Sequence, residues 1–265
     1  MEPTERIPRR FAETRAASRP ALVVYLTAGD PSPGRTPSLA LALERGGADI
    51  LELGVPFSDP IADGPVIQQA SDRALKAGTT VEHVLEIAAE IRRRSEIPIV
   101  LFSYINPLLR YGFDKLCRDA RQAGVDGVLV TDLSVEEAGE PVESMRRHGL
   151  DRIFLAAPTS TDRRLDLVAQ YSSGFVYVVS RTGVTGARET VSRGVEELAR
   201  RLRARTPLPL AVGFGISRRE HVEEVGRYAD GAVVGSAVMR VVDESPDEEL
   251  EARLEGLCRE LSGRR

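Results

Sequence analysis

The sequence contains few of the residues that bind metal ions or form disulfides. Its 265 residues include two cysteines, three histidines and no tryptophan. Cys117 and Cys258 lie far apart in segments with helical patterns, and no cluster of metal ligands surrounds either one, so we expect no disulfide. The histidines, which are His83, His148 and His221, also fall on predicted helices without the spacing of metal ligands. We therefore expect no metal site and assign the histidines to surface or structural positions.

Lysine is as rare as cysteine, and the glycine-rich signatures of nucleotide binding are missing. Lys76 and Lys115 are the two lysines, and both lie in predicted helices rather than at the ends of strands. A mechanism through a lysine Schiff base therefore has no obvious residue. No segment resembles a dinucleotide-binding loop or a Walker loop.

No stretch of the chain has the composition expected for a membrane or nucleic-acid partner. No run of about 18 apolar residues occurs, and residues 1–20 contain acidic side chains and lack the apolar core of a secretory signal. The net charge is −4 with acids and bases interspersed, whereas polyanion-binding proteins concentrate Lys and Arg on one face. We expect a cytoplasmic protein with no nucleic-acid or membrane partner.

Eight short apolar stretches have the pattern of buried parallel strands. Each is rich in Leu or β-branched residues and is followed by helix-like periodicity. After the fourth stretch, the apolar residues from Val135 to Met145 recur every three or four positions with glutamates between them, as in an outer helix. The eight predicted strands are residues 21–29, 48–56, 97–104, 125–133, 151–160, 173–180, 209–217 and 229–238.

The alternation of strands and helices determines the expected fold. Eight βα units in a chain of this length are typical of a closed (β/α)8 TIM barrel, and an open doubly wound sheet is the alternative. The interval after the second strand is long enough for two helices, 66–77 and 81–94, so we expect one extra helix there. An N-terminal helix would close the bottom of the barrel, although a basic amphipathic surface helix fits the same residues. Because no linker interrupts the series, we predict a single TIM-barrel domain over residues 1–265.

A lone glutamate lies inside the second predicted strand. Side chains alternate along a strand, so Ile50, Glu52 and Gly54 share the face that points into the barrel. Apolar surroundings disfavour the ionised carboxylate and raise its pKa, which suits a group that both donates and accepts a proton. Glu52 is therefore a candidate catalytic residue. A buried pairing with Arg or Lys, or a solvent-exposed place at the strand end, would explain it without catalysis.

The loop that follows, VPFSDPIADGP (55–65), holds two aspartates and three prolines. Proline fixes φ and removes a donor, so we expect a rigid rim of an active site that brings Asp59 and Asp63 near Glu52. Two carboxylates in different surroundings can divide acid and base roles. Asp63 and Gly64 also form an ordinary turn signal, and Asp59 could equally hold the loop together.

Three glycine-bearing loops follow the last three predicted strands, at 180–189, 213–217 and 233–238. Such loops and a helix N-terminus form the common phosphate site of TIM barrels, because glycine lets backbone N–H groups approach an oxyanion. Glycines at strand ends also serve packing alone. The residues together predict cofactor-free proton chemistry on a phosphorylated small molecule. The candidate donors are Gly215, Gly235 and Ser236, with Gly186 from the sixth loop.

Four segments together resemble one enzyme family. LELGVPFSDPIADGP (51–65), YLTAGDP (25–31), SRTGVTGA (180–187) and GFGIS (213–217) closely resemble the tryptophan synthase alpha subunits, and the likeness is colinear over almost the whole chain. The resemblance implies a lyase that cleaves indole-3-glycerol phosphate to indole and glyceraldehyde 3-phosphate. It also implies that this chain holds no cofactor and passes indole to a beta subunit with pyridoxal phosphate, in an alpha2beta2 complex.

The resemblance also assigns roles to single residues. Glu52 matches the family's general acid/base, which protonates indole C3 and accepts a proton from the glycerol hydroxyl. Asp63 matches the carboxylate that stabilises charge at the indole N–H. Without the family, the residues that match the indole pocket are more simply explained as core. The matching positions are Tyr25, Phe102, Leu129, Tyr177, Thr185 and Phe214 for substrate, and Gly186, Gly215, Gly235 and Ser236 for phosphate.

One residue departs from the family pattern. Ser134, in TDLSVEE (131–137), stands where relatives commonly have proline, in a loop near the beta interface. Loss of proline increases the entropy of the unfolded chain and adds a backbone donor, so we expect an effect on partner communication rather than on chemistry. Residues 55–60 would be interface as well as active site. Two alternatives remain: a stand-alone lyase that releases indole, and a phosphate-binding barrel that acts mainly as an allosteric subunit.

Overall fold

The fold is known from a computed structural model that describes residues 4–179, 193–213 and 215–264. Within these residues, nine strands form one parallel sheet in the order β5-β4-β3-β2-β1-β9-β8-β7-β6. β5 pairs with β4 and β6 pairs with β7, and the two lie on either side of Phe154 in the chain, so together they fill one position of a barrel. The strands are β1 Ala21–Thr27, β2 Ile50–Gly54, β3 Ile99–Ser103, β4 Gly127–Val130, β5 Asp151–Ile153, β6 Leu155–Ala156, β7 Val176–Val179, β8 Leu210–Gly213 and β9 Gly231–Val234.

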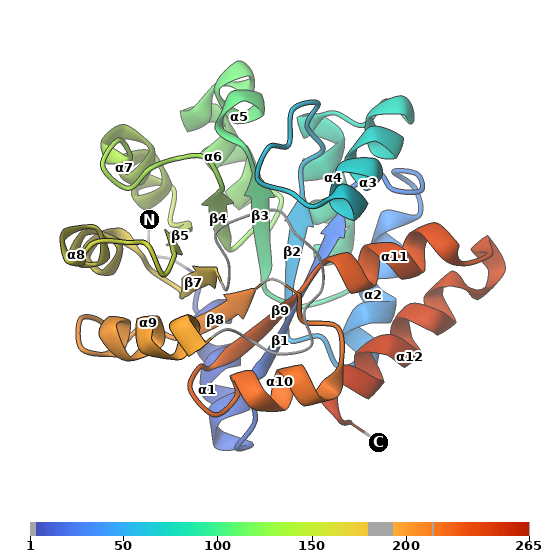
Figure 1. Cartoon of the computed structure of the whole chain (residues 1–265). Helices are drawn as coiled ribbons and strands as arrows, with labels where there is room; N and C mark the ends of the chain where they lie inside the picture. Colours follow the sequence, from blue (N-terminus) through green and yellow to red (C-terminus); the bar gives the residue numbers. More distant parts are fainter. Residues whose placement is uncertain (1–3, 180–192, 214, 265) are drawn as a thin grey trace.

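Helices surround this barrel, as Figure 1 shows from one end. The predicted (β/α)8 TIM barrel is confirmed, and so is the extra helix after β2, where both α3 and α4 are found. Each of the eight predicted strands contains one or two of the observed ones. The helices are α1 Arg6–Ala16, α2 Thr36–Gly46, α3 Pro65–Lys76, α4 Val81–Arg92, α5 Ile105–Tyr111, α6 Phe113–Gln122, α7 Gly139–Arg147, α8 Asp162–Tyr171, α9 Arg193–Arg203, α10 Arg219–Val225, α11 Ser236–Glu244 and α12 Leu250–Ser262.

Side-chain alternation divides the core into an inner and an outer part. Residues such as Val23, Ile50 and Val100 point into the barrel and pack on one another, whereas Leu51 and Leu101 belong to the larger cluster beneath the helices. All seven residues of β1 and all five of β2 are buried, as expected for parallel strands covered on both faces. Since Glu52 follows Ile50 by two positions, this alternation places its side chain on the inner face.

The structure differs from the sequence prediction in three places. The helix after β4 begins at Gly139 rather than near Val135, because a turn closed by the Glu137 N–H and the Ser134 carbonyl, 3.1 Å apart, precedes it. The fifth strand ends well before residue 160, since Pro158 has no N–H to donate to a ladder. Helix α5 was not predicted at all.

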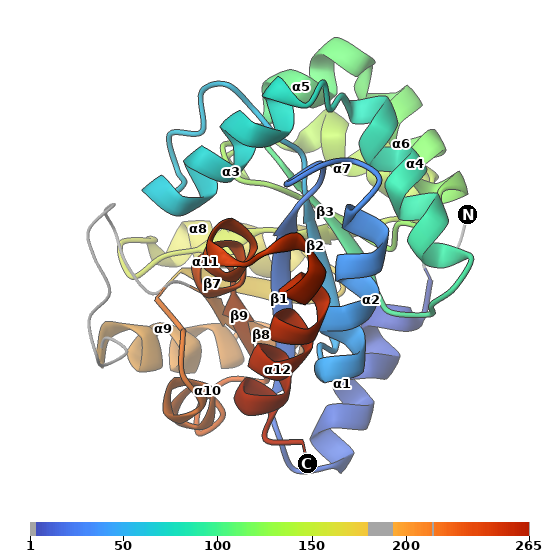
Figure 2. The same cartoon turned by 90° about the vertical axis from the view of Figure 1, so that its right-hand side faces the viewer.

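Helix α1 closes the bottom of the barrel, the end at which the strands begin. Ile7 and Phe11 pack into the inner cluster, and the ring of Phe11 lies 5.6 Å from that of Phe175. Arginines at its ends reach carboxylates at the starts of strands: Arg6 lies 3.1 Å from Asp126, and Arg15 lies 3.2 Å from Asp230. In Figure 2, α1 and the loop between β2 and α3 lie on opposite sides of the molecule. The expected closure of the bottom is confirmed.

The rare residues lie mostly in helices. Cys117 and Cys258 are buried free thiols in α6 and α12. Lys76 ends α3, and Lys115 in α6 forms an ion pair of 2.8 Å with Asp119. None of the helices that the structure describes is long and apolar enough to cross a membrane.

Candidate active site

Glu52 lies at the centre of β2 with its side chain fully buried. Its neighbours in the sheet register are Tyr25 of β1 and Val100 of β3. Neither carboxylate oxygen has a hydrogen-bond partner among the described residues. Burial raises the pKa of Glu52 from 4.5 to about 8. At neutral pH the group is therefore mostly protonated, so it can donate a proton and, once ionised, take one back.

Asp63 lies in the loop between β2 and α3, and its side chain is 7% exposed. Burial raises its pKa from 3.8 to about 6, although a hydrogen bond of 3.0 Å from the Tyr104 hydroxyl to Oδ2 opposes this shift. The turn is closed by two hydrogen bonds, from the Asp63 N–H to the Pro60 carbonyl at 3.0 Å and from Gln68 Nε2 to the Asp63 carbonyl at 2.9 Å. Asp63 is mostly ionised at neutral pH, whereas Glu52 is mostly protonated.

Two buried tyrosines lie within reach of both carboxylates. Burial is the main reason why the pKa of Tyr25 is raised, and the negative charges of Asp63 and Glu52 add to it. For Tyr177 on β7, burial again dominates, followed by the charges of Glu52 and then Asp63. Side chains from β1, β2, β7 and the β2–α3 loop thus meet at the mouth, the end of the barrel at which the strands finish. Perturbed titratable groups gathered in this way are typical of active sites.

Two glycines make room for these tyrosines. A Cβ on Gly54 would lie 2.2 Å from the Tyr25 hydroxyl, and a Cβ on Gly213 would lie 2.1 Å from the Tyr177 hydroxyl. Any other residue at either position would displace a tyrosine from the inner face of the barrel. The glycine in LELG and the first glycine in GFGIS are therefore explained by close packing inside the site.

Four of the six residues predicted to contact the substrate belong to the described part of the chain. The rings of Tyr25 and Phe102 pack edge to face with their centroids 5.1 Å apart. Phe102 is opposite Leu129 in the register of β3 and β4, and Leu129 is fully buried in the inner cluster. With Tyr177, these side chains form an apolar wall beside Glu52. Thr185 and Phe214 lie outside the described residues.

The predicted phosphate site lies at the same end of the barrel. Gly213 and Val233 are paired in the sheet, so Gly215 and Gly235 both lie two residues beyond that pair. Gly215 has φ +77° and open space where a Cβ would be, as suits a backbone that a ligand approaches closely. Gly235 is the N-cap of α11, and Ser236 is its first residue, so their N–H groups point along the helix N-terminus. Gly186 lies outside the described residues.

Comparisons with known proteins agree with this arrangement. A family model described as tryptophan synthase alpha chain matches residues 11–263. The tryptophan synthase alpha chain of Solibacter usitatus is 60% identical over 257 residues, which cover 97% of this chain and 96% of the relative. The chain belongs to the tryptophan synthase alpha chain family. Membership implies a lyase role in tryptophan synthesis.

Solved structures of the family share the fold at high coverage. A tryptophan synthase structure from M. tuberculosis has a TM-score of 0.88 and 36% identity, covering 98% of each chain. A structure of the tryptophan synthase α2β2 complex from Pyrococcus furiosus has a TM-score of 0.87 and 43% identity, covering 92% of this chain and 99% of that one. The barrel and its inserted helix are therefore those of the family.

Asp59 and Ser134, two loop residues noted in the sequence, make only local contacts among the described residues. Asp59 is exposed, and its carboxylate accepts a hydrogen bond of 2.5 Å from the neighbouring Ser58 hydroxyl. Ser134 donates to the Glu137 carboxylate at 3.0 Å and so helps to close the turn before α7. This side-chain hydrogen bond holds the turn before α7.

Sequence reasoning missed Tyr104, which touches Asp63. It was included in the third predicted strand, but it received no role. The structure shows that β3 ends at Ser103 and that Tyr104 is the N-cap of α5. Side-chain alternation places Tyr104 on the same face as Phe102, two positions earlier, but it does not reveal the contact with Asp63.

Arg73 is a second residue that the sequence did not reveal. Its guanidinium donates to both carboxylate oxygens of the fully buried Asp30, at 2.8 Å each, and lies 2.7 Å from Asp243. Asp30 belongs to the YLTAGDP motif after β1, and Asp243 lies on α11. The pairing ties α3, which follows the Asp63 loop, to the helix whose N-terminus is the predicted phosphate site.

Within the described ranges, no group of three His, Cys, Asp or Glu side chains could hold a metal ion. His83 lies in the capping box of α4, His148 follows α7, and His221 lies in α10. The functional groups described at the mouth are carboxylates, tyrosine hydroxyls and backbone N–H groups.

Proposed function

We propose that this chain is the alpha subunit of a tryptophan synthase and cleaves indole-3-glycerol phosphate to indole and glyceraldehyde 3-phosphate. One observation carries the proposal: Glu52 is fully buried on the inner face of the barrel, without a partner among the described residues and with Asp63 at the same mouth. A buried carboxylate without a partner costs stability, and its retention is explained by chemistry.

The two carboxylates divide the proton chemistry. Protonated Glu52 gives its proton to C3 of the indole, and Asp63 in its ionised form stabilises the positive charge that develops at the indole N–H. Glu52, now ionised, accepts the proton of the glycerol hydroxyl next to the bond that breaks. The O–H electrons form the aldehyde carbonyl, and the electrons of the broken C–C bond return to the indole ring. Glu52 is again protonated at the end of the cycle.

The remaining candidates bind and orient the substrate. The indole would lie against Tyr25, Phe102, Leu129 and Tyr177, with Phe214 completing the wall. Backbone N–H groups of Gly215, Gly235 and Ser236 would hold the phosphate, with Gly186 from the sixth loop. Thr185 on that loop would contact the site when it closes and excludes water.

The partner in this proposal is a tryptophan synthase beta subunit in an α2β2 complex. The Pyrococcus furiosus structure is described as such a complex. Pyridoxal phosphate would belong to the beta subunit, with no cofactor in this chain. The loop 55–60 lies beside Ile61, whose side chain is 78% exposed and so available to a partner. We also propose that residues 1–265 form one domain and that the protein works in the cytoplasm.

Steady-state cleavage of indole-3-glycerol phosphate tests the proposal. Glyceraldehyde 3-phosphate release is followed for the purified chain, with and without the cognate beta subunit. We expect slow cleavage by the chain alone and a large increase with its partner. Absence of cleavage in both cases would overturn the assignment.

Two other outcomes correspond to the alternatives. Fast cleavage that the partner does not change would favour a stand-alone lyase, for which Ser134 is the one specific hint. Binding of a substrate analogue that alters the beta reaction, without any cleavage, would favour an allosteric phosphate-binding barrel. The buried Glu52 argues against the allosteric barrel, because a subunit that only binds a ligand does not need a desolvated carboxylate.

A further inference from the structure

We propose that Tyr104 is a positioning residue for Asp63: its hydroxyl fixes the carboxylate at the mouth and stabilises the ionised form. This inference rests on the proposed function and deepens it, because Asp63 acts there as the negative charge beside the indole N–H. It assigns a role to a residue that neither its position in the sequence nor its burial alone would reveal.

The hydrogen bonds at Tyr104 have a defined direction. The hydroxyl accepts a hydrogen bond from the Ala62 N–H at 2.9 Å, which leaves its single proton for the Asp63 Oδ2, 3.0 Å away. Among the described residues, Tyr104 supplies the one hydrogen bond to the Asp63 carboxylate. Both partners belong to one loop, so the hydroxyl holds the backbone at residue 62 and the side chain at residue 63 together.

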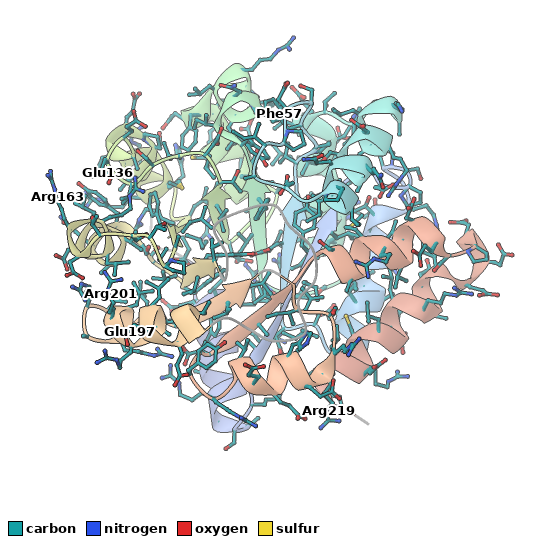
Figure 3. All side chains as sticks on the ribbon, in the orientation of Figure 1. Phe57, Glu136, Arg163, Glu197, Arg201 and Arg219 are labelled. Atoms are coloured by element: carbon teal, nitrogen blue, oxygen red, sulfur yellow. The ribbon has the colours of Figure 1, made fainter. Side chains whose placement is uncertain are left out.

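Tyr104 is itself held firmly. Tyr104 is 3% exposed, and the centroid of its ring lies 5.2 Å from the ring centroid of Phe57, which is on the same loop as Asp63. Figure 3 labels Phe57 on this loop, beside α5. The next residue, Ile105, donates its N–H to the Asp132 carboxylate at 2.7 Å, which anchors the start of α5 to the loop after β4. A donor fixed in this way is pre-organised for a carboxylate.

Among the described residues, the other groups that face Asp63 do not stabilise its ionised form. In addition to burial, the negative charge of Asp63 raises the pKa of Tyr25 on β1 and of Tyr177 on β7, and the charge of Glu52 on β2 raises the same two pKa values. Within the part of the chain that the structure describes, no cation pairs with Asp63. Burial already raises its pKa to about 6 against the opposing effect of the Tyr104 hydrogen bond. Loss of that bond should therefore raise the pKa further.

The test is the pH profile of kcat/KM for Tyr104→Phe in the cognate complex, between about pH 5 and pH 9. Because a charge-assisted hydrogen bond is lost, we expect the acid limb to move to higher pH. The activity loss should be about tenfold at the pH of the wild-type acid limb and should shrink as the pH rises. An equal loss at every pH would overturn the proposal, since a purely structural role gives that result.

Tyr111→Phe is the matched control. The Tyr111 hydroxyl also donates to an aspartate, Asp119 Oδ2 at 2.8 Å, but both residues lie on the outer helices α5 and α6. We expect this variant to keep the wild-type profile. A shift of the acid limb in Tyr111→Phe as large as that in Tyr104→Phe would also overturn the proposal, because a general effect of losing a tyrosine hydroxyl would then explain both.

A measurement without substrate separates this inference from the proposed function. Carbon-13 NMR of the aspartate carboxyl groups, with Asp63→Asn to identify the signal, follows the titration of Asp63 directly. Tyr104→Phe should titrate at higher pH than wild type, whatever the substrate is. If wild type fails to cleave indole-3-glycerol phosphate, the proposed function fails while this titration still decides the role of Tyr104; an unchanged titration overturns that role.

Discussion

Asp126 and Asp49 at the bottom of the barrel and Glu52 at its mouth are all buried carboxylates, but their surroundings are opposite. At the bottom, the fully buried Asp126 accepts hydrogen bonds from Arg92 at 3.0 Å and from the Ile99 N–H at 2.8 Å. Asp49 likewise accepts hydrogen bonds from Arg19 at 2.6 Å and from the Leu22 N–H at 2.9 Å. At the mouth, Glu52 is equally buried and has no partner among the described residues.

This difference separates carboxylates that hold the fold from those that can react. A buried carboxylate that accepts two or more charged or backbone hydrogen bonds stays ionised and fixed. A carboxylate without them keeps its proton at neutral pH and can exchange it. Arg6 of α1, Arg92 of α4 and Arg19 between α1 and β1 supply partners at the bottom. The described side chains around Glu52 are instead tyrosines and apolar groups.

Asp151 shows that burial by itself does not mark an active site. It lies at the start of β5, and burial raises its pKa to about 6, as for Asp63. Its Oδ1 accepts a hydrogen bond of 2.7 Å from Ser173, but its Oδ2 has no partner among the described residues. Because it lies at the end of the barrel opposite the mouth, we assign it no part in the reaction.

The first prediction removes the reactive carboxylate. Glu52→Gln should lower the cleavage rate by roughly 10²–10⁴, because the amide cannot transfer the proton. Below about pH 4, where the carboxyl group is protonated in both the folded and the unfolded protein, stability should change by less than about 1 kcal/mol, since a neutral amide replaces a neutral acid. Cleavage assays and urea unfolding measure the two effects. Exposed Glu86→Gln on α4 is the matched control and should change neither.

The second prediction removes a structural carboxylate. Asp126→Ala should destabilise the protein by about 3–5 kcal/mol, because Arg92 and the Ile99 N–H lose a buried partner. The folded fraction should keep the wild-type cleavage rate within a few-fold. The exposed pair of Glu136 and Arg164, 3.0 Å apart, serves as control: Glu136→Gln should leave the stability nearly unchanged. A rate loss in Asp126→Ala as large as that in Glu52→Gln would abolish the distinction between the two ends.

The third prediction concerns pH and stability. Between its ordinary pKa of 4.5 and its folded value of about 8, Glu52 holds a proton in the folded state that the unfolded chain has released. The free energy of unfolding therefore falls as the pH rises, by up to about 1.4 kcal/mol per pH unit from this group. Glu52→Gln removes this slope, so its stability relative to wild type should increase with pH. Parallel curves for the two proteins would show that Glu52 is ionised throughout.

Much of the fold follows from sequence patterns that have one physical meaning. The runs in β1 and β2 are too apolar for any place other than a strand buried on both faces, and the structure has them there. The boundaries depend on finer chemistry. The late start of α7 comes from a turn that Ser134 and Glu137 form together, which an apolar periodicity from Val135 cannot reveal.

The places of Glu52 inside the barrel and of Asp63 in the loop after β2 could be predicted, because alternation and motif agree there. The site was not predictable where a contact joins distant segments. Tyr104 meets Asp63 across 41 positions, and Arg73 meets Asp30 across 43, through a loop and a helix that only the closed barrel brings together. No local pattern in the sequence encodes either pairing.

The proposed mechanism requires Glu52 to be a protonated acid at neutral pH. Difference infrared spectroscopy of wild type against Glu52→Gln, titrated across the neutral range, measures this directly. We expect a carboxylic-acid carbonyl band that is present at neutral pH, absent from the variant and half lost near pH 8. A Glu52 carboxylate band that persists through neutral pH, with no acid band, would contradict the proposed mechanism.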